Sequence, residues 1–139
     1  MWRRVLPLLA GYGASLACPM RKELPVPLQP PDVAFPVMWT ILYLLLGEAW
    51  HRATPSPFAD VSLGACTLLL TCWPILYSCM DARREAAYLI ATTVSSVVVS
   101  MVLHPSPIAP LLLTPLLAWL LIAFQLNWCI ATRSELRVE

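Results

Sequence analysis

Long apolar segments alternate with short polar ones along the whole chain. The apolar segments cover residues 5–20, 33–50, 61–80, 86–103 and 108–131. A helix needs about 20 residues, within a range of roughly 17–25, to cross the hydrocarbon core of a bilayer. The later four segments have this length, and the first gains it when Met1 and Trp2 extend it and the adjacent arginines reach the interface. The pattern predicts an all-α, polytopic membrane protein.

The same pattern predicts how the chain is organised. A single domain over residues 1–139 would form a five-transmembrane-helix bundle, because the polar connections are too short to hold a second domain. The expected helices span about residues 2–20, 33–50, 61–80, 86–103 and 108–131. The first segment also resembles a secretory signal peptide, since MWRR precedes an apolar stretch and small residues. Pro19 directly follows the candidate cleavage point, which favours an uncleaved first helix.

Composition supports a lipid environment. Of the 139 residues, 59% are hydrophobic and only 12% are charged, and the mean hydropathy is +0.71. A water-soluble domain of this size could not hide so much apolar surface. The net charge of +1 leaves no basic surface for nucleic acid. No phosphate-binding, dinucleotide-binding or zinc-protease motif is present, so we predict neither a catalytic residue nor a metal site.

Basic residues predict the orientation of the helices, because cytosolic connections carry the excess of Lys and Arg. One side of the membrane would have three basic residues and the other side six. The first group is Arg3, Arg4 and Arg52, and the second is Arg21, Lys22, Arg83, Arg84, Arg133 and Arg137. The C-terminus and the connection at residues 21–32 are therefore expected in the cytosol.

The five cysteines lie in or beside apolar segments, at Cys18, Cys66, Cys72, Cys79 and Cys129. Their spacings match no zinc pattern. Free cysteine is among the most buried residue types. We therefore expect inert, buried thiols.

Glu48 is the main ionisable candidate within an apolar segment. His51 and Arg52 follow it at i+3 and i+4, where side chains meet on a helix. One interpretation is an ion pair at the membrane interface. The alternative is a carboxylate that carries protons in a small proton-coupled exporter.

Two helices carry features with more than one interpretation. Asn127 is embedded in the last apolar segment, where an unpaired amide would cost about 1–3 kcal/mol. It either ties two helices together or contacts a polar group of a ligand. Gly13 and Ala17 form a small-xxx-small pair, which serves internal packing or a homodimer.

Several motifs together resemble one membrane family. They are Pro36-x-x-Trp39-Thr40-x-Leu42-Tyr43 after a proline-rich connection, Trp73-Pro74, Pro115-x-Leu117-Ala118-Trp119, and Leu126-Asn127-Trp128-Cys129. The sequence resembles the TspO/MBR family of translocator proteins and peripheral-type benzodiazepine receptors. The resemblance implies a five-helix bundle, often dimeric, whose pocket opens towards the first connection. It implies hydrophobic ligands such as porphyrins (protoporphyrin IX or haem) and cholesterol, with no required cofactor. It also implies the outer mitochondrial membrane in a eukaryotic host and a bacterial or other cellular membrane elsewhere.

The resemblance implies a set of ligand-binding residues. Carried over by motif, they are Phe35, Pro36, Met38 and Trp39 from the second helix, and Trp119, Ala123, Leu126 and Asn127 from the fifth. Trp39 and Trp119 resemble tryptophans linked in bacterial members to light-dependent porphyrin breakdown, which gives an enzymatic alternative. A sterol motif would use Leu126, Trp128 and Arg133, with tryptophan in the place of the usual tyrosine.

Overall fold

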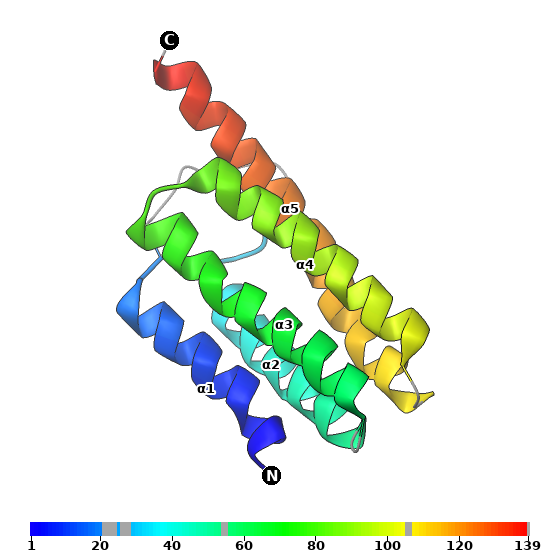
Figure 1. Cartoon of the computed structure of the whole chain (residues 1–139). Helices are drawn as coiled ribbons and strands as arrows, with labels where there is room; N and C mark the ends of the chain where they lie inside the picture. The colour runs from blue at the N-terminus through cyan, green and yellow to red at the C-terminus, as the bar shows by residue number, and fades with distance from the viewer. Residues whose placement is uncertain (21–24, 26–28, 54–55, 105–106, 139) are drawn as a thin grey trace.

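The computed structural model describes residues 1–20, 25, 29–53, 56–104 and 107–138. Its elements are α1 (Trp2–Ala17), α2 (Ala34–Arg52), α3 (Pro57–Pro74), the π-helical turn η1 (Ile75–Cys79), α4 (Arg83–Leu103) and α5 (Ile108–Val138) (Figure 1). The described residues contain no strand. The predicted all-α fold with five helices is confirmed.

The helices begin where local chemistry favours it. The Ser56 hydroxyl accepts a hydrogen bond from the Ala59 N–H at 3.3 Å, and Pro57 takes the first helical position. This capping starts α3 four residues before the predicted boundary at residue 61. In α2, Pro36 lies in the first turn, where its missing N–H would have no partner within the helix.

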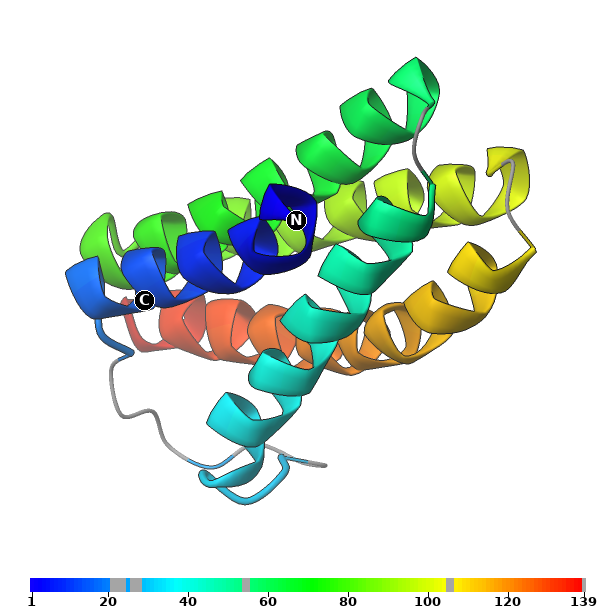
Figure 2. The same cartoon turned by 90° about the horizontal axis from the view of Figure 1, so that it is seen from below.

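The helices pack as a bundle with a leucine-rich interior. α1 contacts α2 and α3, α4 contacts α3 and α5, and α5 also contacts α2. Seen from below, α2 runs obliquely to α5 (Figure 2). The largest fully buried side chains include Leu42, Leu46, Leu63, Leu113, Leu116 and Leu120. The close packing of these side chains fixes how the helices face one another.

The outer surface of the bundle is apolar as well. Leu9, Leu16, Val61, Leu68, Val102 and Leu111 are all more than half exposed. Among the residues that the structure describes, three stretches have the length and composition of membrane spans, namely Pro57–Cys79, Arg83–Leu103 and Ile108–Arg137. α1 is shorter, with 16 residues, and α2 ends in polar residues. An apolar exterior on long apolar helices is the arrangement of an integral membrane protein.

Glycines allow α1 to lie close to α2. A Cβ on Gly47 would lie 2.1 Å from the Arg4 carbonyl oxygen, and one on Gly11 would lie 2.3 Å from the Tyr43 ring. A Cβ on Gly13 would meet nothing within 4 Å. Gly13 therefore plays no part in this internal contact, and of its two interpretations only the homodimer stays open.

Polar side chains join the N-terminal end of α1 to α2 and α3. The Arg3 guanidinium donates to both carboxylate oxygens of Asp60, at 2.8 and 3.0 Å. The Trp50 indole N–H donates to the same carboxylate at 2.8 Å. This cluster could not be predicted from linear patterns, because its members come from three separate helices.

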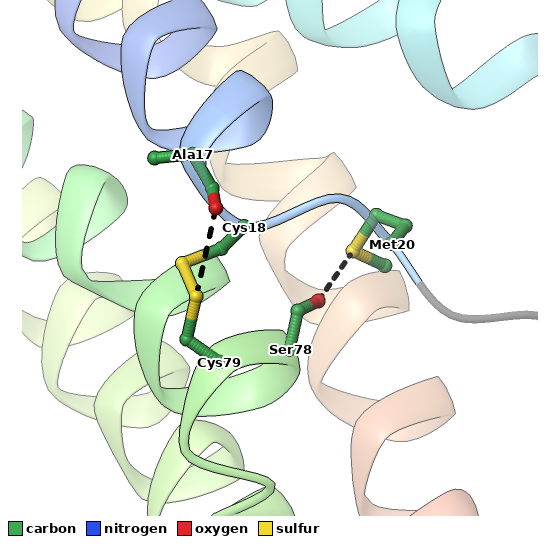
Figure 3. The surroundings of a disulfide bond; sticks show 5 residues. All are labelled: Ala17, Cys18, Met20, Ser78 and Cys79. Atoms are coloured by element: carbon green, nitrogen blue, oxygen red, sulfur yellow. Dashed lines mark hydrogen bonds between the residues drawn. A yellow bond between two sulfur atoms is a disulfide. The ribbon is translucent and has the colours of Figure 1, made fainter.

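A disulfide joins the other end of α1 to η1 (Figure 3). Cys18 and Cys79 are 61 positions apart in the sequence, and their Cα atoms lie 5.3 Å apart. The prediction of five free thiols is therefore wrong for this pair. Sequence spacing could not reveal it, because only the packing of α1 against η1 brings the two residues together. The free cysteines are Cys66, which is buried, and Cys72 and Cys129, which are partly buried.

Candidate functional site

A cavity of about 500 Å³ lies between the helices, and its lining includes exposed residues such as Tyr12 and Asp32. Its described lining comes from α1, α2, α3, η1 and α5 and from the connection between α1 and α2. The residues are Gly11, Tyr12, Ser15, Met20, Gln29, Asp32, Phe35, Pro36, Trp39, Tyr43, Trp73, Pro74, Tyr77, Trp119, Ala123, Leu126, Asn127 and Ile130. A volume in the range of about 300–1,000 Å³ is typical of small-molecule sites.

Stacked aromatic rings form one wall of the cavity. Trp39 stacks on Tyr43 and on Trp73, with ring centroids 5.6 and 6.3 Å apart. Trp73 in turn stacks on Tyr77 at 5.1 Å. Trp119 meets Trp39 edge-on at 6.4 Å. Such a wall gives the cavity a large aromatic surface, which suits flat hydrophobic ligands.

Local helix geometry places these rings together. Trp39 and Tyr43, like Trp73 and Tyr77, are four residues apart, and this spacing puts side chains on one helix face. Pro74 ends α3 between the second pair, and η1 continues with the wider turn of a π-helix. Pro lacks the N–H that an α-helix uses, so a change of helix type at this point is expected.

Asn127 joins α5 to α3 inside the cavity wall. Its Oδ1 accepts a hydrogen bond from the Trp73 Nε1–H at 3.2 Å, and its Nδ2 donates to the Ala123 carbonyl at 2.7 Å. The structure thus supports the interpretation that Asn127 ties two helices together. The amide also fixes the orientation of the Trp73 ring.

Polar groups from α1 and α2 meet at another part of the lining. The Tyr12 hydroxyl forms a hydrogen bond with the Thr40 hydroxyl. Thr40 Oγ1 donates to the Pro36 carbonyl at 2.7 Å. This pairing connects α1 to the first turns of α2 and holds the Tyr12 ring beside the cavity.

Most of the predicted ligand-binding residues lie together around this cavity. The lining contains Phe35, Pro36, Trp39, Trp119, Ala123, Leu126 and Asn127. Met38 is not part of the described lining and packs against the hydrophobic core. Successive helical residues point about 100° apart, so Met38 faces away from the side that Trp39 shares with the cavity. Ligand binding by these residues stays a prediction.

Sequence reasoning missed the α1 side of the cavity and the aromatic pair from α3 and η1. Gly11, Tyr12 and Ser15 come from α1, whose part in the cavity depends on how the helices pack. Trp73 and Tyr77 offered a usable signal, because they repeat the i, i+4 aromatic spacing of the second helix.

The proposed sterol motif is spread over two sides of α5. Leu126 is buried and lines the cavity, whereas Trp128 is 40% exposed and stacks on Phe124 at 6.1 Å. Arg133 Nη1 donates to the Pro25 carbonyl at 2.9 Å. The structure does not bring the three residues into one site, and their role in sterol binding stays a prediction.

Glu48 lies away from the described lining, towards the far end of α2. Its carboxylate accepts hydrogen bonds from Arg52 Nε at 2.8 Å and from Arg4 Nε at 2.9 Å. The i, i+4 ion pair expected from the sequence is present, and α1 adds a second guanidinium. A carboxylate held by two guanidinium groups fits an ion pair at the interface better than a proton carrier.

The described residues contain no group of three or more His, Cys, Asp or Glu that could hold a metal ion.

These features define a polytopic α-helical membrane protein with an aromatic-lined cavity between its helices. The model of the TspO/MBR family matches residues 6–133, nearly the whole chain, and the protein belongs to this family. A search among curated proteins gave no match. Family membership supports a membrane-embedded role in ligand binding or translocation.

Proposed function

We propose that this protein binds a porphyrin, cholesterol or a related flat hydrophobic ligand in the cavity between α2 and α5. The observation that carries the proposal is the stacked wall of Trp39, Tyr43, Trp73 and Tyr77 in a cavity of about 500 Å³. Aromatic faces with a few fixed polar groups are typical of sites for such ligands. The ligand would enter from the bilayer or the interface, and binding would precede any transport.

The proposal includes a setting. In a eukaryotic host the protein would lie in the outer mitochondrial membrane, and elsewhere in a bacterial or other cellular membrane. The C-terminus would face the cytosol, by the bias of basic residues. A homodimer would use surface outside the internal contact of α1 with α2. Gly13 belongs to such surface, since a Cβ added there would meet nothing within 4 Å.

Replacing Trp39 or Trp119 with alanine is expected to weaken protoporphyrin IX binding about tenfold, because each change removes an aromatic face from the cavity. Binding is measured in detergent from the shift of the porphyrin Soret band, which does not depend on the number of tryptophans in the protein. Circular dichroism verifies that the helices remain.

Trp128→Ala is the matched control, because Trp128 is also a stacked aromatic of α5 but lies outside the described lining. Its affinity should equal that of the unchanged protein. If all three variants bound protoporphyrin IX as tightly as the unchanged protein, the cavity would not be the binding site.

Light-dependent porphyrin breakdown is a second candidate activity. Trp39 and Trp119 both line the cavity, and their ring centroids are 6.4 Å apart, so one bound porphyrin could touch both. The reaction would need light, oxygen and bound porphyrin. We expect illumination of the complex in air to change the porphyrin spectrum, and the change should be lost in Trp39→Phe. An unchanged spectrum under illumination would rule out this activity.

A further inference from the structure

The polar side chains around the cavity differ in whether they already have hydrogen-bond partners within the protein. The Tyr12 hydroxyl bonds to the Thr40 hydroxyl, and the Asn127 amide oxygen accepts from the Trp73 indole. The Tyr43 hydroxyl forms no hydrogen bond with any residue in the described part of the chain. It is a donor that these residues leave available.

Tyr43 lies halfway along α2, nine positions from Ala34 at one end and nine from Arg52 at the other. A helix rises by about 1.5 Å per residue, so about 13 Å separates Tyr43 from each end of α2. The residue is only 7% exposed and belongs to the described lining of the cavity. A hydroxyl at this depth is removed from bulk water, and without a hydrogen bond it costs free energy.

The Tyr43 hydroxyl is accessible from the cavity. The Trp119 indole N–H is fully buried and has no partner in the described part of the chain, whereas the Tyr43 oxygen is not fully buried. A Cβ on Gly11, which also lines the cavity, would lie 2.7 Å from that oxygen. The glycine therefore lets the hydroxyl lie against the α1 side of the cavity.

The position of the hydroxyl suits an oxygen atom on the rim of a flat ligand. The Tyr43 ring stacks on Trp39 with centroids 5.6 Å apart, so the hydroxyl lies at an edge of the aromatic wall. In surroundings of low polarity a hydrogen bond is stronger than in water. A site that bonds a ligand oxygen discriminates against an analogue without it, because the hydroxyl is then left without a partner.

We propose that Tyr43 determines ligand specificity by donating a hydrogen bond from its hydroxyl to an oxygen atom of the bound ligand. The inference rests on the proposed function, since it concerns the same cavity. It narrows the ligand class to flat hydrophobic molecules that carry a carboxylate, carbonyl or hydroxyl oxygen at their rim. Purely hydrocarbon analogues of the same shape bind more weakly.

Three porphyrins with one type of macrocycle test the inference. They are protoporphyrin IX with two carboxylates, its neutral dimethyl ester, and etioporphyrin, which carries only alkyl groups and no oxygen. Each is titrated against the unchanged protein and Tyr43→Phe in one uncharged detergent, and the Soret band reports binding. The ratio of Kd between variant and unchanged protein is taken for each porphyrin separately, so that partition into the micelle cancels.

Tyr43→Phe should weaken binding of the diacid and of the ester about fivefold or more, as expected for the loss of one hydrogen bond. Binding of etioporphyrin should change by less than about twofold. Tyr88→Phe is the control, because it removes a hydroxyl from α4 at a residue outside the described lining. It should leave all three affinities unchanged.

The stability of Tyr43→Phe tests whether the hydroxyl has a partner anywhere in the protein. The unfolding midpoint in a titration with sodium dodecyl sulfate should stay the same or rise, because no internal hydrogen bond is lost. A lower midpoint would show that the hydroxyl is bonded within the protein and would overturn the inference.

Two binding results would also overturn the inference alone. Equal weakening of all three porphyrins would mean that Tyr43→Phe changes the shape of the cavity, and unchanged affinity for all three would mean that no ligand oxygen contacts the hydroxyl. Absence of saturable binding of every porphyrin to the unchanged protein would overturn the proposed function and this inference with it.

Discussion

Replacing Gly47 with alanine is expected to lower the free energy of unfolding by about 3 kcal/mol, the upper part of the range for overpacked sites. The added Cβ would lie 2.1 Å from the Arg4 carbonyl oxygen and 2.8 Å from the carbonyl carbon. Backbone atoms cannot rotate out of the way, so α1 and α2 must move apart. The measurement is the unfolding midpoint in a titration of mixed micelles with sodium dodecyl sulfate, followed by circular dichroism.

Gly13→Ala is the control for this change, because it makes the same substitution in α1, the helix that Gly47 of α2 contacts. A Cβ on Gly13 meets nothing within 4 Å. Alanine loses less backbone entropy than glycine in a helix, so the control should gain about 0.5–1 kcal/mol. A gain in both variants would show that helix propensity, and not the approach of α1 to α2, sets the effect.

Removal of the bridge between Cys18 and Cys79 is the second large effect that we expect. The double change to serine should cost about 2–4 kcal/mol, since the bridge closes a long loop and restricts the unfolded chain. Cys129→Ser is the control, because Cys129 is a partly buried free thiol. The same detergent titration measures both variants.

A thiol count tests the bridge itself. Alkylation of the denatured protein without reductant should modify only Cys66, Cys72 and Cys129, and reduction before alkylation should add Cys18 and Cys79. Mass spectrometry reads the number of added groups. Modification of all the cysteines without reductant would show that the bridge does not form.

The helices could be predicted because each one must be apolar along its length to lie in lipid. Boundaries were less certain, since they depend on local hydrogen bonds. α1 ends at Ala17 rather than at residue 20, and α5 continues to Val138 rather than ending at residue 131. The extra turns of α5 carry polar residues, so hydropathy alone could not show that the helix continues. One of these residues, Glu135, pairs with Arg84 of α4 at 3.1 Å.

The cavity lining could be predicted in part. The motifs around Trp39 and Trp119 pointed to two helices that do line the cavity. Nothing in a linear pattern shows that Tyr12 lies beside them, because its position depends on the close contact of α1 with α2. Met38 is adjacent to Trp39 in the motif but lies outside the described lining, because rotation about the helix axis separates the two side chains.

The bridge also bears on how the protein sits in its membrane. It lies at the end of the bundle that the basic residues assign to the cytosol, where glutathione and thioredoxin keep thiols reduced. Charge and cysteine chemistry thus favour opposite directions of insertion. Met20, which lines the cavity, follows Cys18 by two residues and accepts a hydrogen bond from Ser78, the neighbour of Cys79 (Figure 3). In an oxidising compartment the disulfide joins the end of α1 to η1 beside the cavity, whereas in a reducing compartment only packing holds the two together. The direction of insertion therefore decides how firmly α1 closes the cavity.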